Sequence, residues 1–556
     1  MSEDAQPHFA RAAEFFARRQ YFDAAQSLRR GLAIQPVSHT HWFNLGAVLN
    51  ILGDAVQAQA ALGEALRLVP DFAEAHLEVG FILTRGGQLD LAASHFARAA
   101  LIRPDNAQAH NALGVVARAQ SRHADAINSL RRAISLDPRY AEAHSNLATV
   151  LADVERFDEA FAEFERAISL QPGLLAARHG YANALFAVGR FDESTACLRR
   201  IVEMTPNDPV AHSNLATALR GTLDLPGAMA EYDRALALAP DDPEVRLNRG
   251  IALLMMGDYE RGFADYEFRL RVPGLDKFLK NETTGRWDGA EATGKTILVR
   301  CEQGFGDAIQ FARFLPVVAR RCDRVVVVAQ PSLVRLIRTV AGVAQVVSDD
   351  AHTPKHDLHV PMMSLAHVLR ISPRTLPSDL PYFQLDATAK NVWSHRLSGD
   401  HARLRVGLAW AGSKTNPRRL ARDLPLGMFT GLAALGGVVF YSLRFGSPDG
   451  GAVAPPGMRM IDHTAQLHDF ADTAGMMQAL DLIISVDTAT AHLAGALDRP
   501  VWVILSRYCD WRWMLDEQIN PWYPSMRLFR QHAEGDWRPV FERLELELSE
   551  MLNRPR

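Results

Sequence analysis

The stretch Leu482-Ile483-Ile484-Ser485-Val486-Asp487-Thr488-Ala489-Thr490-Ala491-His492-Leu493-Ala494-Gly495 changes character in its middle, and this change predicts the fold of the chain's second half. Residues 482–486 form a short, mostly branched apolar run, which is typical of a strand buried on both faces. Residues 487–491 are small or carry hydroxyls, and the pattern over 492–497 is helical. A buried strand that leads into a helix predicts a ligand site at the carboxyl edge of an α/β sheet.

The start of this helix has the chemistry of an anion site. Unpaired backbone N–H groups at a helix N-terminus accept anions such as a diphosphate, and Thr488 and Thr490 add hydroxyl donors. Thr488 and His492 are four residues apart, so they share one helical face. The alternative is an ordinary capped helix in which Asp487 is the N-cap and His492 is a packed side chain.

Strands and helices alternate on both sides of this stretch. A first series begins near Lys295 and a second near Leu404, separated by a polar crossing segment over 388–401. Such alternation predicts parallel, doubly wound sheets. The expected strands cover residues 296–300, 325–329, 343–347, 358–360, 406–410, 438–443, 482–486 and 500–505, and the first two expected helices cover 308–320 and 333–340.

The first half of the chain is a repeat array. Prolines recur every 34 residues, at Pro36, Pro70, Pro104, Pro138, Pro172, Pro206 and Pro240. A small residue, usually alanine, precedes each proline by twelve positions, and a large residue follows the alanine by four. The small residue allows close helix packing, and proline ends the second helix of each unit. This pattern resembles the tetratricopeptide repeat and predicts eight helical hairpins over residues 5–272.

An asparagine register runs through the first helices of the repeats. Asn44, Asn146, Asn214 and Asn248 occupy the same repeat position, although asparagine is a mediocre helix former. A side-chain amide both donates and accepts, so a row of amides suits an extended peptide backbone. The row resembles that of the nucleocytoplasmic O-linked N-acetylglucosamine transferases, which implies a protein acceptor bound by the repeats. The alternatives are bonds between repeats and simple solvation.

Composition excludes several classes of protein. The 556 residues carry a net charge of −4 with no dominant basic block, which argues against nucleic-acid binding. Four cysteines without paired spacing favour a reducing cytosol over a disulfide framework or a zinc site. The acidic N-terminus is unlike a signal peptide, and no apolar run is long enough to span a bilayer. We therefore expect a cytoplasmic protein.

Two motifs in the second half resemble the heptosyltransferase-like glycosyltransferases. These are Glu302-Gln303-Gly304-Phe305-Gly306-Asp307 with Gln310-Phe311-Ala312-Arg313, and Asp487-Thr488-x-x-x-His492. The segments Asp510-Trp511-Arg512-Trp513 and Pro521-Trp522-Tyr523-Pro524 strengthen the resemblance, in particular to bacterial fusions with tetratricopeptide repeats. The resemblance implies a GT-B fold, two Rossmann-like halves facing across a cleft, and transfer of a sugar from a nucleotide donor.

The resemblance assigns a role to the first motif. Asp307 stands where these enzymes place their catalytic base, and a positioned carboxylate can remove the proton of an acceptor hydroxyl. Gly304 and Gly306 allow close approach of the loop to the sugar, and Gln310 belongs to the same donor site. Ala308 departs from the hydroxyl residue that relatives often carry. The alternative is that Asp307 only caps a helix beginning at Ala308.

The second half supplies the remaining donor contacts that the resemblance implies. Thr488 and His492 match contacts to the donor diphosphate, and Asp487 supports their loop. Arg422, with Lys414 nearby in a basic loop, would stabilise the departing phosphate. Ser442-Leu443 follows a strand where the family's backbone meets the base. No Asp-x-Asp metal signature lies near a strand end, so we expect neither a metal nor another cofactor beyond the nucleotide-sugar co-substrate.

The sequence thus predicts an all-α array followed by an α/β GT-B fold: repeats at 1–272, a connector at 273–294 in which Trp287 packs, and halves at 295–392 and 402–556. The expected function is metal-independent, inverting glycosyl transfer to Ser or Thr hydroxyls of a protein, with flagellin as the best guess. The donor is a uridine diphosphate hexosamine or a cytidine monophosphate nonulosonic acid. The alternatives are an inactive repeat scaffold or adaptor, and a transferase acting on lipopolysaccharide or another glycan.

Overall fold

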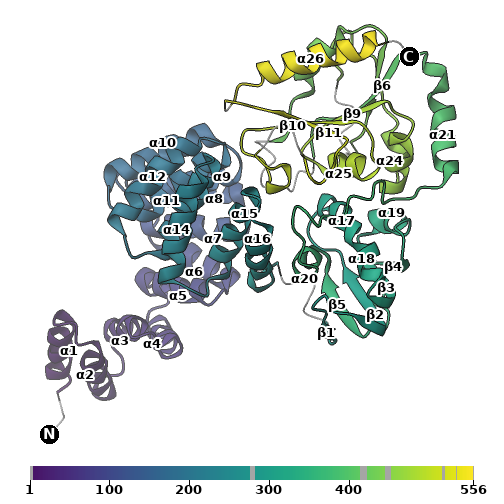
Figure 1. Cartoon of the computed structure of the whole chain (residues 1–556). Coiled ribbons are helices and arrows are strands. Elements are labelled where there is room, and N and C mark those ends of the chain that lie inside the picture. Colours follow the sequence, from purple (N-terminus) through teal and green to yellow (C-terminus); the bar gives the residue numbers. More distant parts are fainter. Residues whose placement is uncertain are drawn as a thin grey trace. The chain divides into compact units, whose positions relative to one another are not determined.

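The structure, a computed structural model, describes residues 4–275, 282–412, 422–444, 453–515, 520–533 and 535–554. Its contacts divide the chain into two compact units, one ending at Leu185 and one beginning at Phe186 (Figure 1). The first unit is helical. The second contains further helices of the repeat array together with two parallel β-sheets. No helix in the described ranges combines the length and the apolar character needed to cross a membrane.

The described repeat region contains sixteen α-helices arranged as eight hairpins, which confirms the prediction. In the first unit they are α1 (Gln6–Ala17), α2 (Tyr21–Ile34), α3 (His39–Ile51), α4 (Ala55–Leu68), α5 (Ala73–Arg85), α6 (Leu89–Ile102), α7 (Ala107–Ala119), α8 (His123–Leu136), α9 (Ala141–Asp153), α10 (Phe157–Leu170) and α11 (Leu175–Ala187), which runs past the unit boundary. In the second unit they are α12 (Phe191–Met204), α13 (Pro209–Gly221), α14 (Leu225–Leu238), α15 (Pro243–Met255) and α16 (Tyr259–Tyr266), followed by the 3-10 helix η1 (Glu267–Arg271).

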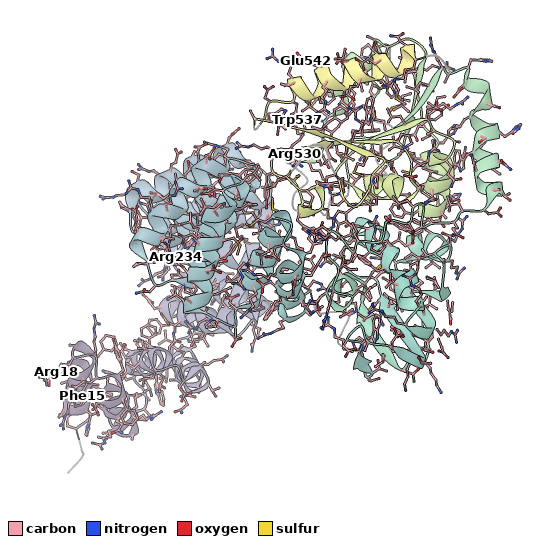
Figure 2. All side chains as sticks on the ribbon, in the orientation of Figure 1. Phe15, Arg18, Arg234, Arg530, Trp537 and Glu542 are labelled. Atoms are coloured by element: carbon pink, nitrogen blue, oxygen red, sulfur yellow. The ribbon has the colours of Figure 1, made fainter. Side chains whose placement is uncertain are left out.

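The repeated alanine and the large residue after it make the hairpins close-packed. Ala58, for example, is fully buried on α4, and Leu62 one turn later lies against Gly46 of α3. The prolines fall just beyond the second helix of each pair, as Pro36 does after α2. Side-chain outlines along the repeats can be followed in Figure 2, where Phe15 and Arg18 lie near the first hairpin and Arg234 lies on α14.

The first sheet is entirely parallel, with the strand order β1-β5-β2-β3-β4. Its strands are β1 (Gly285–Arg286), β2 (Ala292–Arg300), β3 (Cys322–Ala329), β4 (Val343–Ser348) and β5 (Leu358–Pro361). The connector supplies β1, and Trp287 directly after it is buried, as expected, with its backbone N–H bonded to the His359 carbonyl oxygen. Short helices follow the strands: α17 (Phe305–Phe311), α18 (Leu315–Ala319), α19 (Val334–Ile337) and α20 (Leu365–Val368).

The second sheet is also parallel, with the order β11-β10-β9-β6-β7-β8. Its strands are β6 (Leu404–Ala409), β7 (Val438–Ser442), β8 (Met460–Ile461), β9 (Leu482–Val486), β10 (Val501–Leu505) and β11 (Met526–Arg530). The associated helices are α21 (Ala387–Leu397), α23 (Thr430–Ala433), α24 (Phe470–Met477), α25 (Ala489–Ala496) and α26 (Arg538–Asn553). If β6 to β11 are numbered 1 to 6 in chain order, they lie side by side in the order 3-2-1-4-5-6, which is the arrangement of doubly wound dinucleotide-binding folds.

Both faces of the second sheet are covered, as the apolar run over 482–486 predicted. On one face, α26 lies along the sheet (Figure 1). Its Leu544 and Leu548 pack with Leu482, Ile484 and Val486 of β9. Ile483, on the opposite face, joins the core that contains residues of α25. The sheets therefore confirm an α/β region after the repeats.

Some expected elements differ. The polar segment at 388–401 is largely the helix α21, and β11 was not expected at all. The helix predicted from Ala308 begins earlier, at Phe305, and breaks into α17, a 3-10 turn and α18. The α/β core also extends into the repeats, because Tyr259, Phe263 and Tyr266 of α16 belong to the same buried cluster as both sheets. The unit boundary consequently falls inside the repeat array and not at its end.

Candidate functional site

The second sheet reverses its direction of winding between β6 and β9. The chain builds outward from β6 through β7 and β8, then returns to place β9 on the other side of β6. Ligands of open α/β sheets bind at such a switch point, outside the carboxyl ends of the two strands. The residues that follow these ends are 410–412 after β6 and 487–488 after β9.

The loop after β9 leads into the N-terminus of α25. Thr488 has extended backbone angles and is the N-cap of α25, so the interpretation of Asp487 as the cap is wrong. The Thr488 side chain makes no capping bond and its Oγ1 lies 3.1 Å from Ser485 Oγ. The Thr488 side chain therefore does not cap the first N–H groups of α25, and N–H groups at a helix N-terminus can bind an anion.

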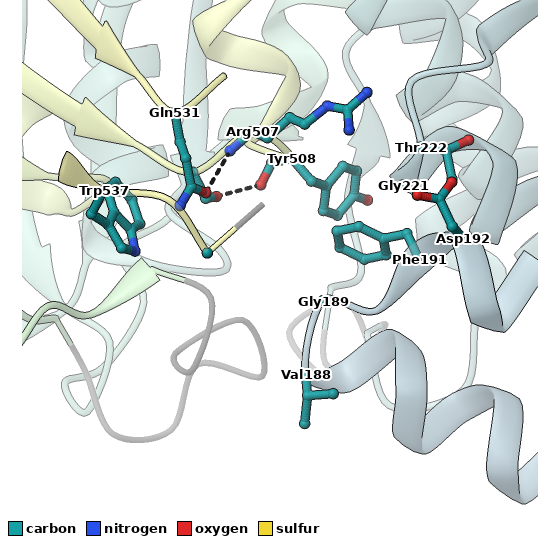
Figure 3. Close-up of a pocket in the computed structure, with 12 residues that line it drawn as sticks. Val188, Gly189, Phe191, Asp192, Gly221, Thr222, Arg507, Tyr508, Gln531 and Trp537 are labelled. Carbon is teal, nitrogen blue, oxygen red and sulfur yellow. Dashed lines mark hydrogen bonds between the residues drawn. The ribbon is translucent and has the colours of Figure 1, made fainter. Parts of the chain in front are cut away.

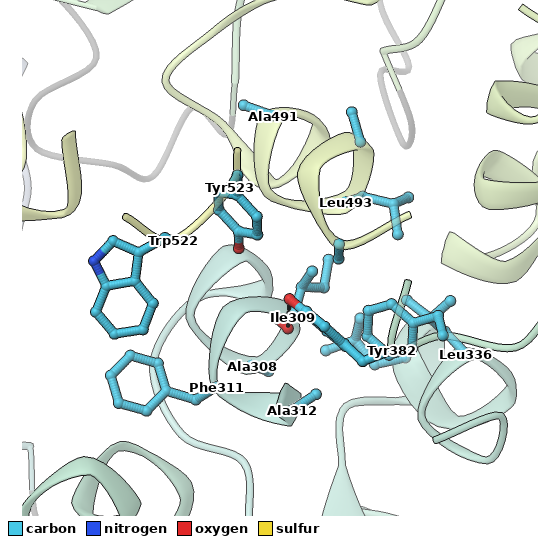
Figure 4. Packing of buried hydrophobic residues seen from close by; sticks show 14 of the residues in the cluster. Ala308, Ile309, Phe311, Ala312, Leu336, Tyr382, Ala491, Leu493, Trp522 and Tyr523 are labelled. Carbon is cyan, nitrogen blue, oxygen red and sulfur yellow. Dashed lines mark hydrogen bonds between the residues drawn. The ribbon is translucent and has the colours of Figure 1, made fainter. Parts of the chain in front are cut away.

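His492 is buried next to Gly306 of the motif Glu302–Asp307. Its ring is 5% exposed and stacks on Trp513 at 4.8 Å between centroids, and Nδ1 lies 3.2 Å from the Tyr523 hydroxyl. Burial lowers its pKa from 6.5 to about 3, so the imidazole is neutral near pH 7. A Cβ atom added to Gly306 would lie 2.9 Å from His492 Cδ2. Figure 4 shows α17 and α25 facing each other, with Tyr523 beside them.

Asp307 occupies the first turn of α17. Gly304 is the N-cap, and its N–H donates to Asp307 Oδ2 at 2.9 Å, so the carboxylate does cap the helix. The other oxygen accepts from Arg512 Nη2. Burial raises the pKa of Asp307 above its usual value, although the Arg512 guanidinium beside it favours the charged form. The side chain is still 21% exposed, which leaves room for contact with a ligand.

Arg512 is the site residue that sequence reasoning did not single out. It comes from the segment after β10, and it donates to Asp307, to Asp510 Oδ1 at 2.6 Å and to Gln310 Oε1 at 2.7 Å. It therefore joins α17 of the first α/β half to the second half. Gln310 is fully buried, and its Nε2 has no hydrogen-bond partner among the residues that the structure describes. The available signal was the position of Arg512 within the quoted Asp510–Trp513 motif.

Arg422 lies at the switch point. A Cβ atom added to Gly412 would overlap Arg422 Nη2 and lie 3.1 Å from Thr488 Cγ2, which places these residues together. Arg422 Nε lies 3.4 Å from Asp423 Oδ1, whereas Nη2 is buried without a hydrogen-bond partner in the described part of the chain. A guanidinium group in this position can bind an anionic ligand. Lys414 lies outside the described residues.

Ser442 and Leu443 lie at the carboxyl end of β7, on the same sheet edge. Both side chains are buried, and the Leu443 N–H is occupied by the Leu408 carbonyl oxygen at 3.0 Å. That Ser442 and Leu443 contact the donor base stays a prediction. The described residues contain no group of three or more His, Cys, Asp or Glu side chains arranged to hold a metal ion. That the activity needs no metal stays a prediction.

Comparison with known proteins identifies the helical half. Models of the tetratricopeptide repeat match residues 52–109, 83–138, 111–174, 151–219 and 224–257. The chain contains tetratricopeptide repeats. It is also 27% identical to Protein FlbA of Caulobacter vibrioides over 302 residues, a match that covers 50% of this chain and 48% of that protein. The chain thus spans about half the length of this curated relative.

Two solved structures that match part of this chain are repeat proteins. A tetratricopeptide repeat protein from Parabacteroides merdae is 18% identical, covers 43% of this chain and 95% of its own, and has a TM-score of 0.37. YrrB, described as a tetratricopeptide repeat protein with an unusual peptide-binding site, is 21% identical with coverages of 32% and 91% and a TM-score of 0.29.

The asparagines of the tetratricopeptide repeats have different surroundings. In the first unit Asn44 on α3 is exposed, whereas Asn146 on α9 is half-buried and donates to Asn111 Oδ1 of the preceding repeat at 2.9 Å. The alternative of bonds between repeats therefore holds for Asn146. In the second unit Asn214 and Asn248 are half-buried on α13 and α15. Their use in binding a peptide stays a prediction.

A separate pocket of about 160 Å³ lies at the carboxyl ends of β10 and β11. Arg507, Tyr508 and Gln531 line one side, and Phe191 and Asp192 of α12 line the other (Figure 3). The Tyr508 ring meets the Phe191 ring at 5.0 Å between centroids. None of the predicted site residues lines this pocket.

Proposed function

We propose that this protein is a glycosyltransferase that binds a nucleotide-linked sugar at the switch point of its second sheet and transfers the sugar to a protein. The observation that carries the proposal is the meeting of three groups there. These are the N-terminus of α25, which the Thr488 side chain does not cap, the Arg422 Nη2 atom, which has no hydrogen-bond partner within the described residues, and, through the close approach of Gly306 to His492, the loop that bears Asp307.

These groups suit the charges of the reaction. The donor phosphate, or the two phosphates of a diphosphate donor, would lie at the N-terminus of α25 and against Arg422, where partial and full positive charges are available. If the Tyr523 hydroxyl donates to His492 Nδ1, the neutral ring carries its proton on Nε2 and can donate it to an oxygen of the donor. No step in this scheme needs His492 to change its charge, in agreement with its lowered pKa.

Asp307 is the proposed base. The acceptor hydroxyl oxygen forms a bond to the anomeric carbon of the sugar, the bond from that carbon to the phosphate oxygen breaks, and the nucleotide leaves with the electron pair. Asp307 takes the hydroxyl proton, a task that a raised carboxyl pKa favours because the base then holds the proton more strongly. Attack opposite the leaving phosphate inverts the configuration of the sugar. The fold of the two α/β halves is, on this proposal, GT-B.

The tetratricopeptide repeats would supply the acceptor. Repeat arrays bind partners through their concave faces, and the asparagine positions are suited to an extended chain bearing a Ser or Thr hydroxyl. Flagellin is the acceptor that the family resemblance suggests. The donor base and sugar remain those of a uridine diphosphate hexosamine or a cytidine monophosphate nonulosonic acid, in the cytoplasm.

A protein-binding adaptor without activity is the second candidate. The specific observation in its favour is that both carboxylate oxygens of Asp307 already accept hydrogen bonds and that His492 is enclosed by rings. Such a site could be purely structural. The two candidates differ in one property, because an adaptor of this kind has no reason to bind a nucleotide.

A thermal-shift screen against uridine, cytidine, guanosine and adenosine diphosphates and cytidine monophosphate separates the candidates. A ligand at about a hundred times its dissociation constant adds about 2.7 kcal/mol to the free energy of unfolding. We expect one base to stabilise the protein and Arg422→Ala to reduce that shift. Absence of any shift in the wild type favours the adaptor.

A further inference from the structure

The last tetratricopeptide repeat departs from the others at a buried position. Arg269 is 1% exposed, yet its repeat register is otherwise filled by small or apolar residues. These are Gly31, Ala65, Ala99, Ala133, Ala167, Ile201 and Ala235. A buried guanidinium is costly unless it is paired. Within the last repeat Arg269 Nη1 donates to Glu267 Oε1 at 2.7 Å, and a second carboxylate pairs with it from outside the repeat.

The partners outside the repeat follow strands of the first sheet. Arg269 Nη2 donates to Glu302 Oε1 at 2.6 Å and to Ser364 Oγ at 2.8 Å, and both charged side chains are 1% exposed. Glu302 Oε1 also accepts the Met363 N–H at 3.0 Å. Glu302 follows β2 and Met363 follows β5, the two neighbouring strands at which the first sheet reverses its winding. The last repeat is thus bonded to the switch point of that sheet.

A second departure lies one turn earlier. Tyr266 occupies the register of the large repeat residue, where the other repeats place Leu or Phe and only Tyr232 is also a tyrosine. Phe164 fills the same register in complete burial, so packing there does not require a hydroxyl. The Tyr266 hydroxyl donates to Gln303 Oε1 at 3.0 Å, whereas that of Tyr232 meets Thr217 within the repeats.

The residue held by Tyr266 has an unusual backbone. Gln303 has a φ of 62°, in the left-handed region that few residues other than glycine adopt. Its carbonyl oxygen accepts from Gln330 Nε2 at 3.2 Å. Gly304, next in the chain, is the N-cap whose N–H bonds to Asp307. The conformation of residues 302–304 therefore sets where α17 begins and where the Asp307 carboxylate lies.

We propose that Tyr266 and Arg269 are positioning residues of the α/β site: the last repeat holds the loop Glu302–Gly304 in the conformation that places Asp307. The part of this inference that concerns turnover rests on the proposed function. The part that concerns the loop does not. The final repeat then contacts the loop of the α/β site directly, in addition to ending the repeat array.

The test compares two variants of the full chain, Tyr266→Phe and Tyr232→Phe. Each removes one hydroxyl at the same repeat register, and Phe is accommodated there in other repeats. Hydrogen exchange of the amides of residues 302–307 should be roughly 2- to 12-fold faster in Tyr266→Phe, the equilibrium factor of one net hydrogen bond. Tyr232→Phe should leave these amides unchanged.

Turnover provides the second measurement. Tyr266→Phe should lower kcat by a similar factor while the KM for the donor is retained, because the donor phosphates are bound at the other sheet. Equal exchange of residues 302–307 in the two variants would overturn the inference. If the wild type neither binds nor consumes any donor, the proposed function fails, while the exchange comparison still decides whether the last repeat holds the loop.

Discussion

Asp307→Asn separates a catalytic carboxylate from a structural one. The replacement keeps a side-chain oxygen that can accept the Gly304 N–H, so the bond from the first turn of α17 back to its N-cap is preserved. It removes the charge that faces Arg512, but Arg512 keeps its bonds to Asp510 and Gln310. The guanidinium is consequently not left as an unpaired buried charge.

The two effects of the variant differ in size. Loss of one hydrogen bond between charged groups costs about 1.5–3 kcal/mol, and the removal of a buried carboxylate whose pKa is raised returns part of this. Loss of a general base lowers kcat by about 10²- to 10⁴-fold, equivalent to about 2.7–5.4 kcal/mol in activation free energy. Folded protein with normal nucleotide binding should therefore lose nearly all turnover.

The assay measures donor consumption and acceptor modification at saturating nucleotide sugar, with the thermal shift by nucleotide as the check on folding. Asp510→Asn is the matched control, because it removes the same charge from the same guanidinium without touching the α17 cap. Wild-type turnover in Asp307→Asn would refute the reasoning and reduce Asp307 to a helix cap. An equal loss in both variants would assign the effect to Arg512.

Three further predictions concern the second unit. Arg422→Ala should weaken binding of a nucleoside diphosphate roughly 10- to 150-fold, by isothermal titration calorimetry, because one or more charge-assisted bonds are lost, whereas Arg335→Ala, which removes a surface ion pair, should not. The pKa of His492 in the folded chain is lowered to about 3, so below pH 6.5 the unfolded chain gains a proton that the folded chain does not. Between pH 6.5 and 5 this difference should lower the free energy of unfolding, measured by denaturant titration, by about 2 kcal/mol. His492→Gln should lack this loss. A chain beginning at Lys295 should aggregate or unfold, whereas one beginning at Phe186 should show a cooperative melting transition by circular dichroism.

The repeats and the central strands could be predicted because their signals are local. A proline every 34 residues and an alanine twelve residues earlier recur regardless of the rest of the fold, and each hairpin packs on its neighbours. The run over 482–486 coincides with β9, since a strand buried on both faces needs apolar residues on both. The switch from strand to helix after it was likewise visible.

Other elements depend on distant contacts and could not be predicted. The helix α17 begins with Phe305 and Gly306, and glycine disfavours helices. Packing against α25 outweighs that preference, because only a residue without a side chain fits beside His492 at position 306. The strand β11 is Met-Arg-Leu-Phe-Arg, a pattern too short and too charged to stand out, and it forms because it pairs with β10.

The site residues also divide into those with a local sequence signal and those that depend on distant contacts. Asp307, Thr488 and His492 could be named from short motifs, and they do lie around one contact between the two α/β halves. Arg512 was hidden, because its importance comes from bonds to residues about 200 positions earlier. The alternative in which Asp487 is the N-cap rested on propensity alone, and it is wrong because the backbone turns one residue later and Thr488 takes that position.

The boundary between binding and chemistry is less sharp than the sequence patterns indicate. Tyr259, Phe263 and Tyr266 belong to the repeats by register, but they are at most 6% exposed in a core that also holds Trp511 and Trp522. Aromatic side chains of this kind each bury roughly 150–250 Å², about 4–6 kcal/mol at 25 cal/mol per Å² as an upper estimate. Removing α16 would therefore expose more apolar surface than a domain of ordinary stability can tolerate. Because the same helix also bonds to the loop before Asp307, an acceptor-binding role of the repeats is better tested by point changes on their exposed faces than by truncation.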